Sequence, residues 1–275
     1  MDTTKPFEFS TSPSELAVRL LSDTAPLVID VRKNDPFLSS QYILPGALRR
    51  DPLLVDIWAN ELPKSQAVLV YCVYGHDVGM NTMYALRQRG IEATFLLGGI
   101  EDWRTAGLTL SNKVAGLSTR WVTRDRPKID RIACPWLIRR FIDAQAEFLY
   151  VPTEQVRQIA EDQNATAYDI NTTVAESKFT HVGELCSFDA FIKHFRLGQD
   201  AAIARLATIV RAADTDTLGR SPEAAGLLAI SIGMSRMHTD DHDMLEAMMP
   251  VYDALYGWCK DKEAGKAEQH NWKQA

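Results

Sequence analysis

Residues 67–90, with the sequence AVLVYCVYGHDVGMNTMYALRQRG, constrain the fold of this chain more than any other segment. The segment begins with an apolar run that contains Val68 and Val70, passes through Cys72 and a short loop with Gly75, and then becomes helical near Val78 or Gly79. This order predicts a buried strand, a tight loop and a helix. We therefore expect a thiol at the end of a strand, directly before a helix N-terminus.

The predicted position of Cys72 has a chemical consequence. The first N-H groups of a helix have no intrahelical partner, and the positive end of the helix dipole lies beside them. This setting favours the thiolate, which is the nucleophilic form of cysteine. The pattern predicts covalent sulfur or phosphoryl chemistry at Cys72, with an oxyanion held by the loop amides. The alternative is an inert cysteine that closes a core strand.

Three further segments agree with one known family. They are LVIDVR (27–32), LPGA (44–47) and FLLGGIEDWRTAGLTL (95–110). Together with the cysteine loop, they make residues 1–112 resemble a rhodanese-like domain. The resemblance implies an α/β fold with a parallel sheet, a persulfide carried on Cys72, a small sulfur donor, a thiol acceptor and no required cofactor.

The resemblance also defines an active-site loop. Its members are Cys72, Val73, Tyr74, Gly75, His76, Asp77 and Val78. The loop length resembles that of sulfurtransferases rather than that of the related phosphatase-like proteins. Active members often carry a basic residue at Val73 or His76, whereas this loop has only His76 beside an acid. Thiosulfate is thus expected to be a poorer donor than a persulfide, with His76 replacing the missing basic residue.

The length of the chain favours two domains. At 275 residues it can bury two cores. We expect a rhodanese-like domain at 1–112, a linker at 113–118, a second domain at 119–262 and a flexible tail at 263–275. The net charge of −6 is shared by both parts, so no nucleic-acid partner is expected.

The sequence also predicts a cytoplasmic protein without a membrane partner. Its first residues show no signal pattern, and the apolar stretch at 224–234 is too short to cross a bilayer. The four cysteines form no CxxC pair, which fits a reducing compartment. The oligomeric state stays open.

The second part of the chain reads as a helix-dominated α+β domain. A helix is predicted from Pro127 onward, with a kink at Pro135, and strands at 146–152, 166–170 and 178–185. Ser221 and Pro222 predict the start of another helix, and the apolar spacing from Leu245 to Tyr256 predicts the last one.

Residues 120–152, 179–191 and 238–247 resemble the C-terminal domain of B-type chromate-resistance proteins. This resemblance implies a connection with chromate. The upstream region that B-type regulators use for DNA is not recognisable in the sequence.

A basic cluster in this second domain is a candidate oxyanion site. Seven basic residues fall between positions 120 and 140, and the strongest candidates are Arg124, Arg126 and Arg131. They could bind chromate or a phosphate. The alternative is that they lie on a solvated face or pair with acidic residues.

A second group suggests a metal site. Its candidate ligands are His181, Glu184, His238, Asp241 and His242, which suit Zn²⁺, Mn²⁺ or Fe²⁺. Alternatively, Asp240 or Asp241 caps the last helix and His238 bonds a terminal carbonyl. Asp214 and Asp216 are further acidic candidates, interpreted as loop residues.

The sequence therefore predicts a sulfurtransferase that uses Cys72, joined to a domain that binds metal or oxyanion. One alternative is a non-enzymatic chromate or metal sensor in which the rhodanese-like fold is an interaction module. Another is a metal-dependent enzyme centred on the C-terminal histidines.

Overall fold

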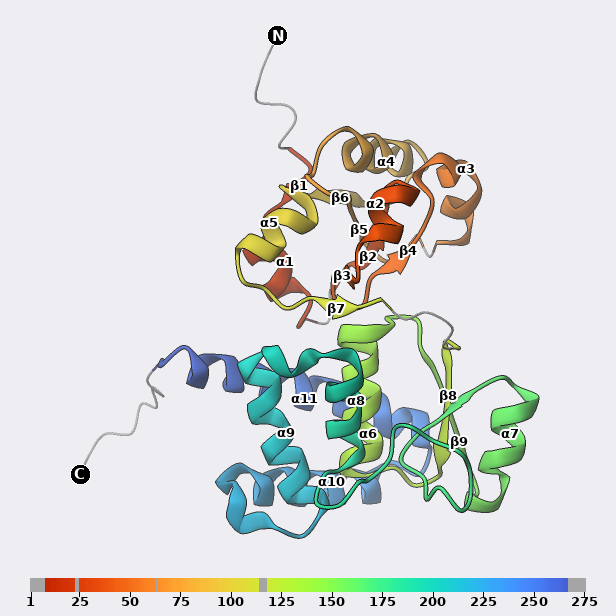
Figure 1. Cartoon of the computed structure of the whole chain (residues 1–275), viewed down its shortest axis with the longest axis vertical. Coiled ribbons are helices and arrows are strands. Elements are labelled where there is room, and N and C mark those ends of the chain that lie inside the picture. Colours follow the sequence, from red (N-terminus) through yellow and green to blue (C-terminus); the bar gives the residue numbers. More distant parts are fainter. Residues whose placement is uncertain (1–7, 23–24, 63, 114–117, 267–275) are drawn as a thin grey trace. The chain divides into compact units, whose positions relative to one another are not determined.

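The computed structural model describes residues 8–22, 25–62, 64–113 and 118–266 (Figure 1). The chain forms two compact units, which are described separately below. Unit 1 comprises Met1–Val122, Pro135–Leu149 and Arg157–Thr166, and unit 2 comprises Thr123–Cys134, Tyr150–Val156 and Ala167–Ala275. Most of the expected linker (114–117) and of the expected tail (267–275) lies outside the described residues.

A five-stranded parallel sheet is the centre of unit 1. Its order is β1-β6-β5-β2-β4, so β5 lies in the middle. The strands are β1 (Ser10–Thr11), β2 (Leu27–Asp30), β4 (Leu48–Arg49), β5 (Val68–Tyr71) and β6 (Ala93–Leu96). Central strands of such sheets are apolar on both faces, as all four residues of β5 are here. The α/β fold with a parallel sheet is thus confirmed.

Alternating residues of β5 belong to the cores on opposite faces of this sheet. Val68, Val70 and Cys72 belong to the core under α3 and α4. Leu69 and Tyr71 belong to the core under α1 and α5. The bounds are α1 (Pro13–Arg19), α3 (Val55–Trp58), α4 (Asp77–Gln88) and α5 (Gly99–Thr105). The alternation directs Cys72 toward the face covered by α4.

Unit 1 also contains three smaller elements between residues 34 and 112. They are α2 (Asn34–Ser39) and an antiparallel pair made of β3 (Tyr42–Ile43) and β7 (Ser111–Asn112).

A buried polar network joins the ends of β2 and β5. The carboxylate of Asp30 receives hydrogen bonds from the Arg32 guanidinium, at 2.6 Å from Nη2, and from the Tyr71 hydroxyl at 2.8 Å. The Tyr71 oxygen in turn accepts the amide of Leu44, which belongs to the predicted proline-glycine turn. The Asp30 carboxylate and the Tyr71 hydroxyl each have several partners, so the network fixes the strand ends from which the cysteine loop departs.

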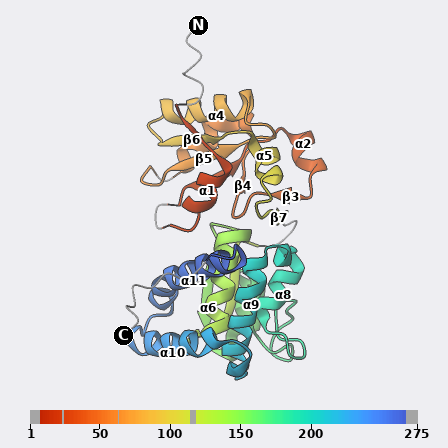
Figure 2. The ribbon, with the colours of Figure 1, turned by 90° about the vertical axis from the view of Figure 1, so that its left-hand side faces the viewer.

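Helices dominate the rest of the chain (Figure 2). The central helix α9 packs against α8, α10 and α11. The helices are α6 (Ile129–Leu137), α7 (Val156–Asp162), α8 (Ser187–Phe195), α9 (Ala201–Asp214), α10 (Pro222–Met237) and α11 (Asp241–Glu263). The strands β8 (Arg120–Arg124), β9 (Glu147–Val151) and β10 (Thr166–Ala167) form a sheet of order β10-β8-β9. The helix-rich α+β prediction is confirmed.

Two predicted strands need correction. The strand expected at 166–170 ends at Ala167, and the strand expected at 178–185 does not form. Instead, Val182 and Leu185 exchange backbone hydrogen bonds around Gly183, whose φ is +63°. A tight turn therefore occupies this segment because its backbone groups bond locally.

The predicted kink at Pro135 takes a specific form. α6 contains Pro135 and changes into a π-helical turn at Ile138–Ile142. Proline removes one helical N-H, which favours such a local change in hydrogen bonding. Among the described residues, no helix has both the length and the apolar composition required to cross a bilayer.

Candidate functional sites

The thiol of Cys72 lies at the carboxyl end of the central strand. Cys72 directly follows β5 and is only 6% exposed. Its Sγ atom lies 3.9 Å from the carbonyl oxygen of His76, the residue before the first turn of α4. A β-carbon at Gly79 would come 3.4 Å from the same Sγ. The thiol thus packs closely against the N-terminal turn of α4, as the sequence predicts.

Glycines hold the loop after Cys72 in its shape. Gly75 has a φ of +68°, and a β-carbon there would come within 2.5 Å of the amide nitrogen of Gly98. Residues Gly98 and Gly99 lead into α5, whose amides of Ile100 and Glu101 donate to the carbonyls of Cys72 and Val73 at 3.0 and 3.1 Å. These bonds engage the loop carbonyls and orient the backbone that follows the thiol.

The other loop residues differ in exposure. Tyr74, His76 and Asp77 are exposed, whereas Val73 and Val78 are half-buried. The rings of Tyr74 and His76 are 6.2 Å apart. An exposed imidazole at the start of α4 is accessible to a donor anion, and its role in tuning Cys72 stays a prediction.

The remaining cysteines have less favourable surroundings for reaction. Cys134, Cys186 and Cys259 are all buried. Burial raises the pKa of the Cys259 thiol to about 12, and it raises the pKa values of the Cys134 and Cys186 thiols well above their ordinary value. Since the thiolate is the reactive form, these three thiols are inert near neutral pH.

Arg126, one of the predicted oxyanion ligands, forms hydrogen bonds within the protein. Its guanidinium donates to the carbonyl oxygen of Ser235 at 2.7 Å and to that of Thr239 at 3.3 Å. Its amide donates to Asp241 at 3.1 Å. Cationic groups are favourable at helix C-termini, so Arg126 stabilises the end of α10.

Arg124 and Arg131 meet at one carboxylate. Arg124 Nη2 lies 3.5 Å and Arg131 Nε lies 3.3 Å from Oδ2 of Asp169. A polar cavity of about 440 Å³ lies at this point, with Arg124, Asp169, Thr180 and His181 in its wall. Burial and the charge of Arg124 lower the pKa of Arg131. The cavity therefore has both positive and negative groups in or behind its wall.

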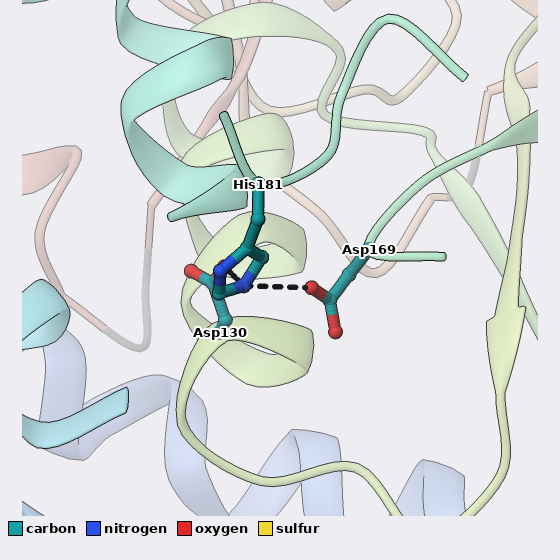
Figure 3. A group of neighbouring side chains, drawn as sticks. All are labelled: Asp130, Asp169 and His181. Atoms are coloured by element: carbon teal, nitrogen blue, oxygen red, sulfur yellow. Dashed lines mark ion pairs between the residues drawn. The ribbon is translucent and has the colours of Figure 1, made fainter. Parts of the chain in front are cut away.

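The imidazole of His181 lies among three carboxylates. Its Nε2 atom is 3.4 Å from Asp130 Oδ2, 3.3 Å from Asp169 Oδ1 and 3.2 Å from Asp214 Oδ2. Figure 3 shows the ring of His181 directed toward Asp130 and Asp169. We call Asp130, Asp169, His181 and Asp214 the Asp/His cluster. Its members come from α6, the segment after β10, the turn before α8 and the last residue of α9.

Hydrogen bonds hold two carboxylates of the Asp/His cluster in place. The amides of Ser187 and Phe188, in the first turn of α8, donate to Asp130 at 2.6 and 3.1 Å. The hydroxyl of Ser187 donates to Asp169 at 2.7 Å. These contacts position both side chains before any ligand arrives.

The carboxylates also set the charge of the cluster. Burial raises the pKa of Asp130 to about 6, although its hydrogen bond with His181 acts in the opposite direction. Burial would raise the pKa of Asp169, but hydrogen bonds from His181 and Ser187 and the charge of Arg131 hold it below its ordinary value. Hydrogen bonds to the three aspartates raise the pKa of His181 to about 12. The three carboxylates therefore favour a positively charged group at the centre of the cluster.

The other predicted metal ligands lie apart from His181. Glu184 pairs with Arg220 at 3.2 Å, Asp241 accepts the amide of Arg126, and the ring of His242 is 5.5 Å from that of Tyr150. His238 is the C-terminal cap of α10. Within the described residues, the structure groups His181 with aspartates rather than with Glu184, His238, Asp241 or His242.

The sequence reasoning overlooked Asp130 and Asp169 as members of a site. Asp130 stands in the apolar helix α6 and is 1% exposed, and Asp169 is 6% exposed. An acidic residue inside an apolar pattern is a recognisable signal, because buried carboxylates need partners. Asp214, interpreted as a loop residue, instead ends α9.

Family profiles match both parts of the chain. The profile described as ChrB, C-terminal domain, matches residues 121–259, and the profile of the rhodanese-like domain matches residues 12–106.

Two relatives match these same parts separately. Protein ChrB from Cupriavidus metallidurans is 37% identical over 139 residues, which are 50% of this chain and 40% of that protein. A sulfurtransferase from Allochromatium vinosum is 32% identical over 98 residues, which are 35% of this chain and 90% of that protein. This chain thus spans less than half the length of the ChrB relative.

Solved structures resemble the N-terminal part. A rhodanese-related protein from Thermoplasma volcanium has 19% identity and a TM-score of 0.33, with 37% of this chain and 95% of that chain covered. A rhodanese-like domain protein from Staphylococcus aureus has 22% identity and a TM-score of 0.31, with 34% and 89% covered.

Proposed function

The chain belongs to the family of ChrB C-terminal domains and carries a rhodanese-like domain before that region, and from this premise we propose that it transfers sulfur through a persulfide on Cys72. The observation that carries the proposal is the position of the Cys72 thiol at the end of the central strand, against the first turn of α4. All four thiols are buried, and burial raises the pKa values of Cys134, Cys186 and Cys259, which disfavours their thiolates.

The proposed reaction has two balanced steps. The Cys72 thiolate attacks the outer sulfur of a donor such as thiosulfate, a new S–S bond forms, and sulfite leaves with the electron pair of the broken bond. An acceptor such as cyanide or a thiolate then attacks the outer sulfur, and the Cys72 thiolate is regenerated. The amides at the start of α4 are available to stabilise the anions formed in both steps.

Mass spectrometry and turnover test this proposal directly. After incubation with glutathione persulfide, the peptide that contains Cys72 should gain one sulfur atom, and cyanide should remove it as thiocyanate. Cys72→Ser should lose both signals, whereas Cys259→Ala, which removes a buried thiol, should keep them. Retained transfer in Cys72→Ser would refute the proposal.

Arg124 and the neighbouring cavity favour a second candidate function, oxyanion binding. The cavity of about 440 Å³ is large enough for a tetrahedral oxyanion, and Arg124 lies in its wall. Together with the resemblance to chromate-resistance proteins, this supports chromate as the ligand. In the sensor alternative, the cavity binds chromate and the rhodanese-like domain only mediates contacts.

The two functions are separable by experiment. Chromate binding should be measured in a Cys72→Ser background, since a reactive thiol would reduce chromate. Arg124→Ala should weaken binding there, while Arg126→Ala should not. Chromate binding without any persulfide turnover in the unmodified chain would favour the sensor alternative.

A further inference from the structure

The Asp/His cluster has more hydrogen-bond acceptors than its histidine can serve. A ring nitrogen carries at most one hydrogen, yet three carboxylate oxygens lie 3.2–3.4 Å from Nε2 of His181. One N-H group cannot direct a good hydrogen bond at three acceptors from different chain segments. A cation that interacts with several oxygens at once would satisfy these carboxylates better than a single N-H group does.

The distances in the cluster match those between ligands of a metal ion. Bonds of roughly 2.0–2.2 Å from a metal to nitrogen and oxygen separate neighbouring ligand atoms by about 3.3–3.6 Å in a tetrahedral site. The separations from His181 Nε2 to Asp130 Oδ2 and Asp169 Oδ1, 3.4 and 3.3 Å, fall within this range. Ligand-type atoms of Asp130, Asp169 and His181 all lie within 4.8 Å of one another.

The surroundings of the cluster are also suited to an ion. The amides of Ser187 and Phe188 and the hydroxyl of Ser187 orient Asp130 and Asp169, as outer partners of metal ligands commonly do. Arg124 and Arg131 lie beside Asp169 and offset part of the negative charge of three carboxylates. The adjoining cavity gives access from solvent, since His181 is 42% and Asp214 21% exposed.

The donor set restricts the kind of ion. Two carboxylates, from Asp130 and Asp169, and the imidazole of His181 combine hard oxygen ligands with a nitrogen ligand typical of transition metals. Mg²⁺ prefers an all-oxygen octahedral shell that retains water. We propose that the Asp/His cluster is a binding site for a first-row divalent cation of the Mn²⁺, Fe²⁺ and Zn²⁺ class, with the imidazole of His181 as its nitrogen ligand.

Mn²⁺ is the probe for the experiment. The full chain is stripped with a chelator, dialysed and titrated with Mn²⁺ under electron paramagnetic resonance, with Mg²⁺ as a competitor. One ion per chain should bind, Mg²⁺ should compete weakly, and the nitrogen coupling of a bound imidazole should be visible in the spin-echo signal. The site does not involve Cys72, so Cys72→Ser should bind Mn²⁺ unchanged.

Two variants and one matched control separate this site from adventitious binding. His181→Gln should remove the nitrogen coupling because it removes a ligand, and Asp214→Asn should weaken Mn²⁺ binding by roughly tenfold or more because it removes a negative charge 3.2 Å from His181 Nε2. Both side chains are partly exposed, so the variants should remain folded, as circular dichroism would check. Asp216→Asn makes the same charge change two residues away, outside the Asp/His cluster, and should bind normally.

Three results would overturn the proposal. They are no saturable binding of Mn²⁺, Fe²⁺ or Zn²⁺ at millimolar concentration, binding that is equal in Asp214→Asn and the unmodified chain, and a nitrogen coupling that persists in His181→Gln.

Discussion

The Sγ atom of Cys72 lies 3.4 Å from the point that a β-carbon would occupy at Gly79. A methyl group at this position would fit beside the thiol but would crowd the additional sulfur atom of a persulfide. Gly79→Ala should therefore reduce persulfide formation several-fold. The free energy of unfolding should stay equal or rise by up to ~1 kcal/mol, since alanine is favoured over glycine in helices. Asn81→Ala, at an exposed position of the same helix, is the control and should transfer sulfur normally.

Alkylation should distinguish the cysteines. Burial raises the pKa of Cys259 to about 12, so only about one molecule in 10⁴ carries its thiolate at pH 8. Iodoacetamide at pH 8 should modify Cys72 in the native protein and leave Cys259 unmodified, and all four cysteines should react in denaturant. Equal rates for Cys259 and Cys72 in the native protein would contradict the structure.

The hydroxyl of Tyr71 should be important for stability. Tyr71→Phe removes the donor to Asp30 and the acceptor of the Leu44 amide, and both groups are buried. Unsatisfied buried polar groups cost about 1–3 kcal/mol, which urea denaturation would measure. Tyr84→Phe is the control. Its side chain is 39% exposed, so this change should lower the free energy of unfolding much less.

Arg126 should be a stabilising residue rather than an anion ligand. Arg126→Ala removes hydrogen bonds to the carbonyl oxygens of Ser235 and Thr239 and should lower the free energy of unfolding by about 1–2 kcal/mol. A loss of chromate affinity larger than that of Arg124→Ala would show instead that Arg126 contacts the anion.

The cap of α11 predicts a pH dependence. Asp240 accepts the amides of Asp243 and His242 at 2.9 Å, and these bonds lower the pKa of its carboxyl. A lowered pKa stabilises the folded state above the unfolded value of about 3.9, and this contribution is lost as pH falls through the folded value.

Thermal unfolding at pH 7 and pH 3 would check this dependence. Asp240→Ala should melt below the unmodified chain at pH 7, and the difference should narrow at pH 3. Asparagine caps a helix without titrating. The difference in melting temperature between Asp240→Asn and Asp240→Ala should therefore change little with pH. An equal difference in melting temperature between Asp240→Ala and the unmodified chain at pH 7 and pH 3 would show that the Asp240 carboxylate does not cause the pH dependence.

The cysteine loop was accessible to sequence reasoning because its signals are local. The apolar strand, Gly75 and the helix that follows occupy one continuous segment, so their order is visible in the sequence without knowledge of tertiary contacts. The turn around Gly183 was mistaken for a strand because β-branched residues suggest extended backbone, while the bonds between Val182 and Leu185 depend on a positive φ.

The Asp/His cluster was not accessible in the same way. Asp130, an acidic residue inside an apolar helix, signals a buried carboxylate but does not show which residues contact it, and Asp214 looks like the start of a loop. Only the packing of α6, α8 and α9 brings them to His181, and no periodicity in the sequence encodes that contact. The histidines at 238 and 242 had the stronger local pattern, yet they lie apart from this cluster.

The wide spacing of the Asp/His cluster along the chain affects how unit 2 opens. Asp130, Asp169 and His181 lie far apart in the chain, so an ion bound to all three would close long loops of the backbone. Partial unfolding of α6 or of the segment before α8 would then require loss of the ion. Hydrogen exchange of these segments should consequently slow when metal is added, even though no helix is extended and no new strand forms.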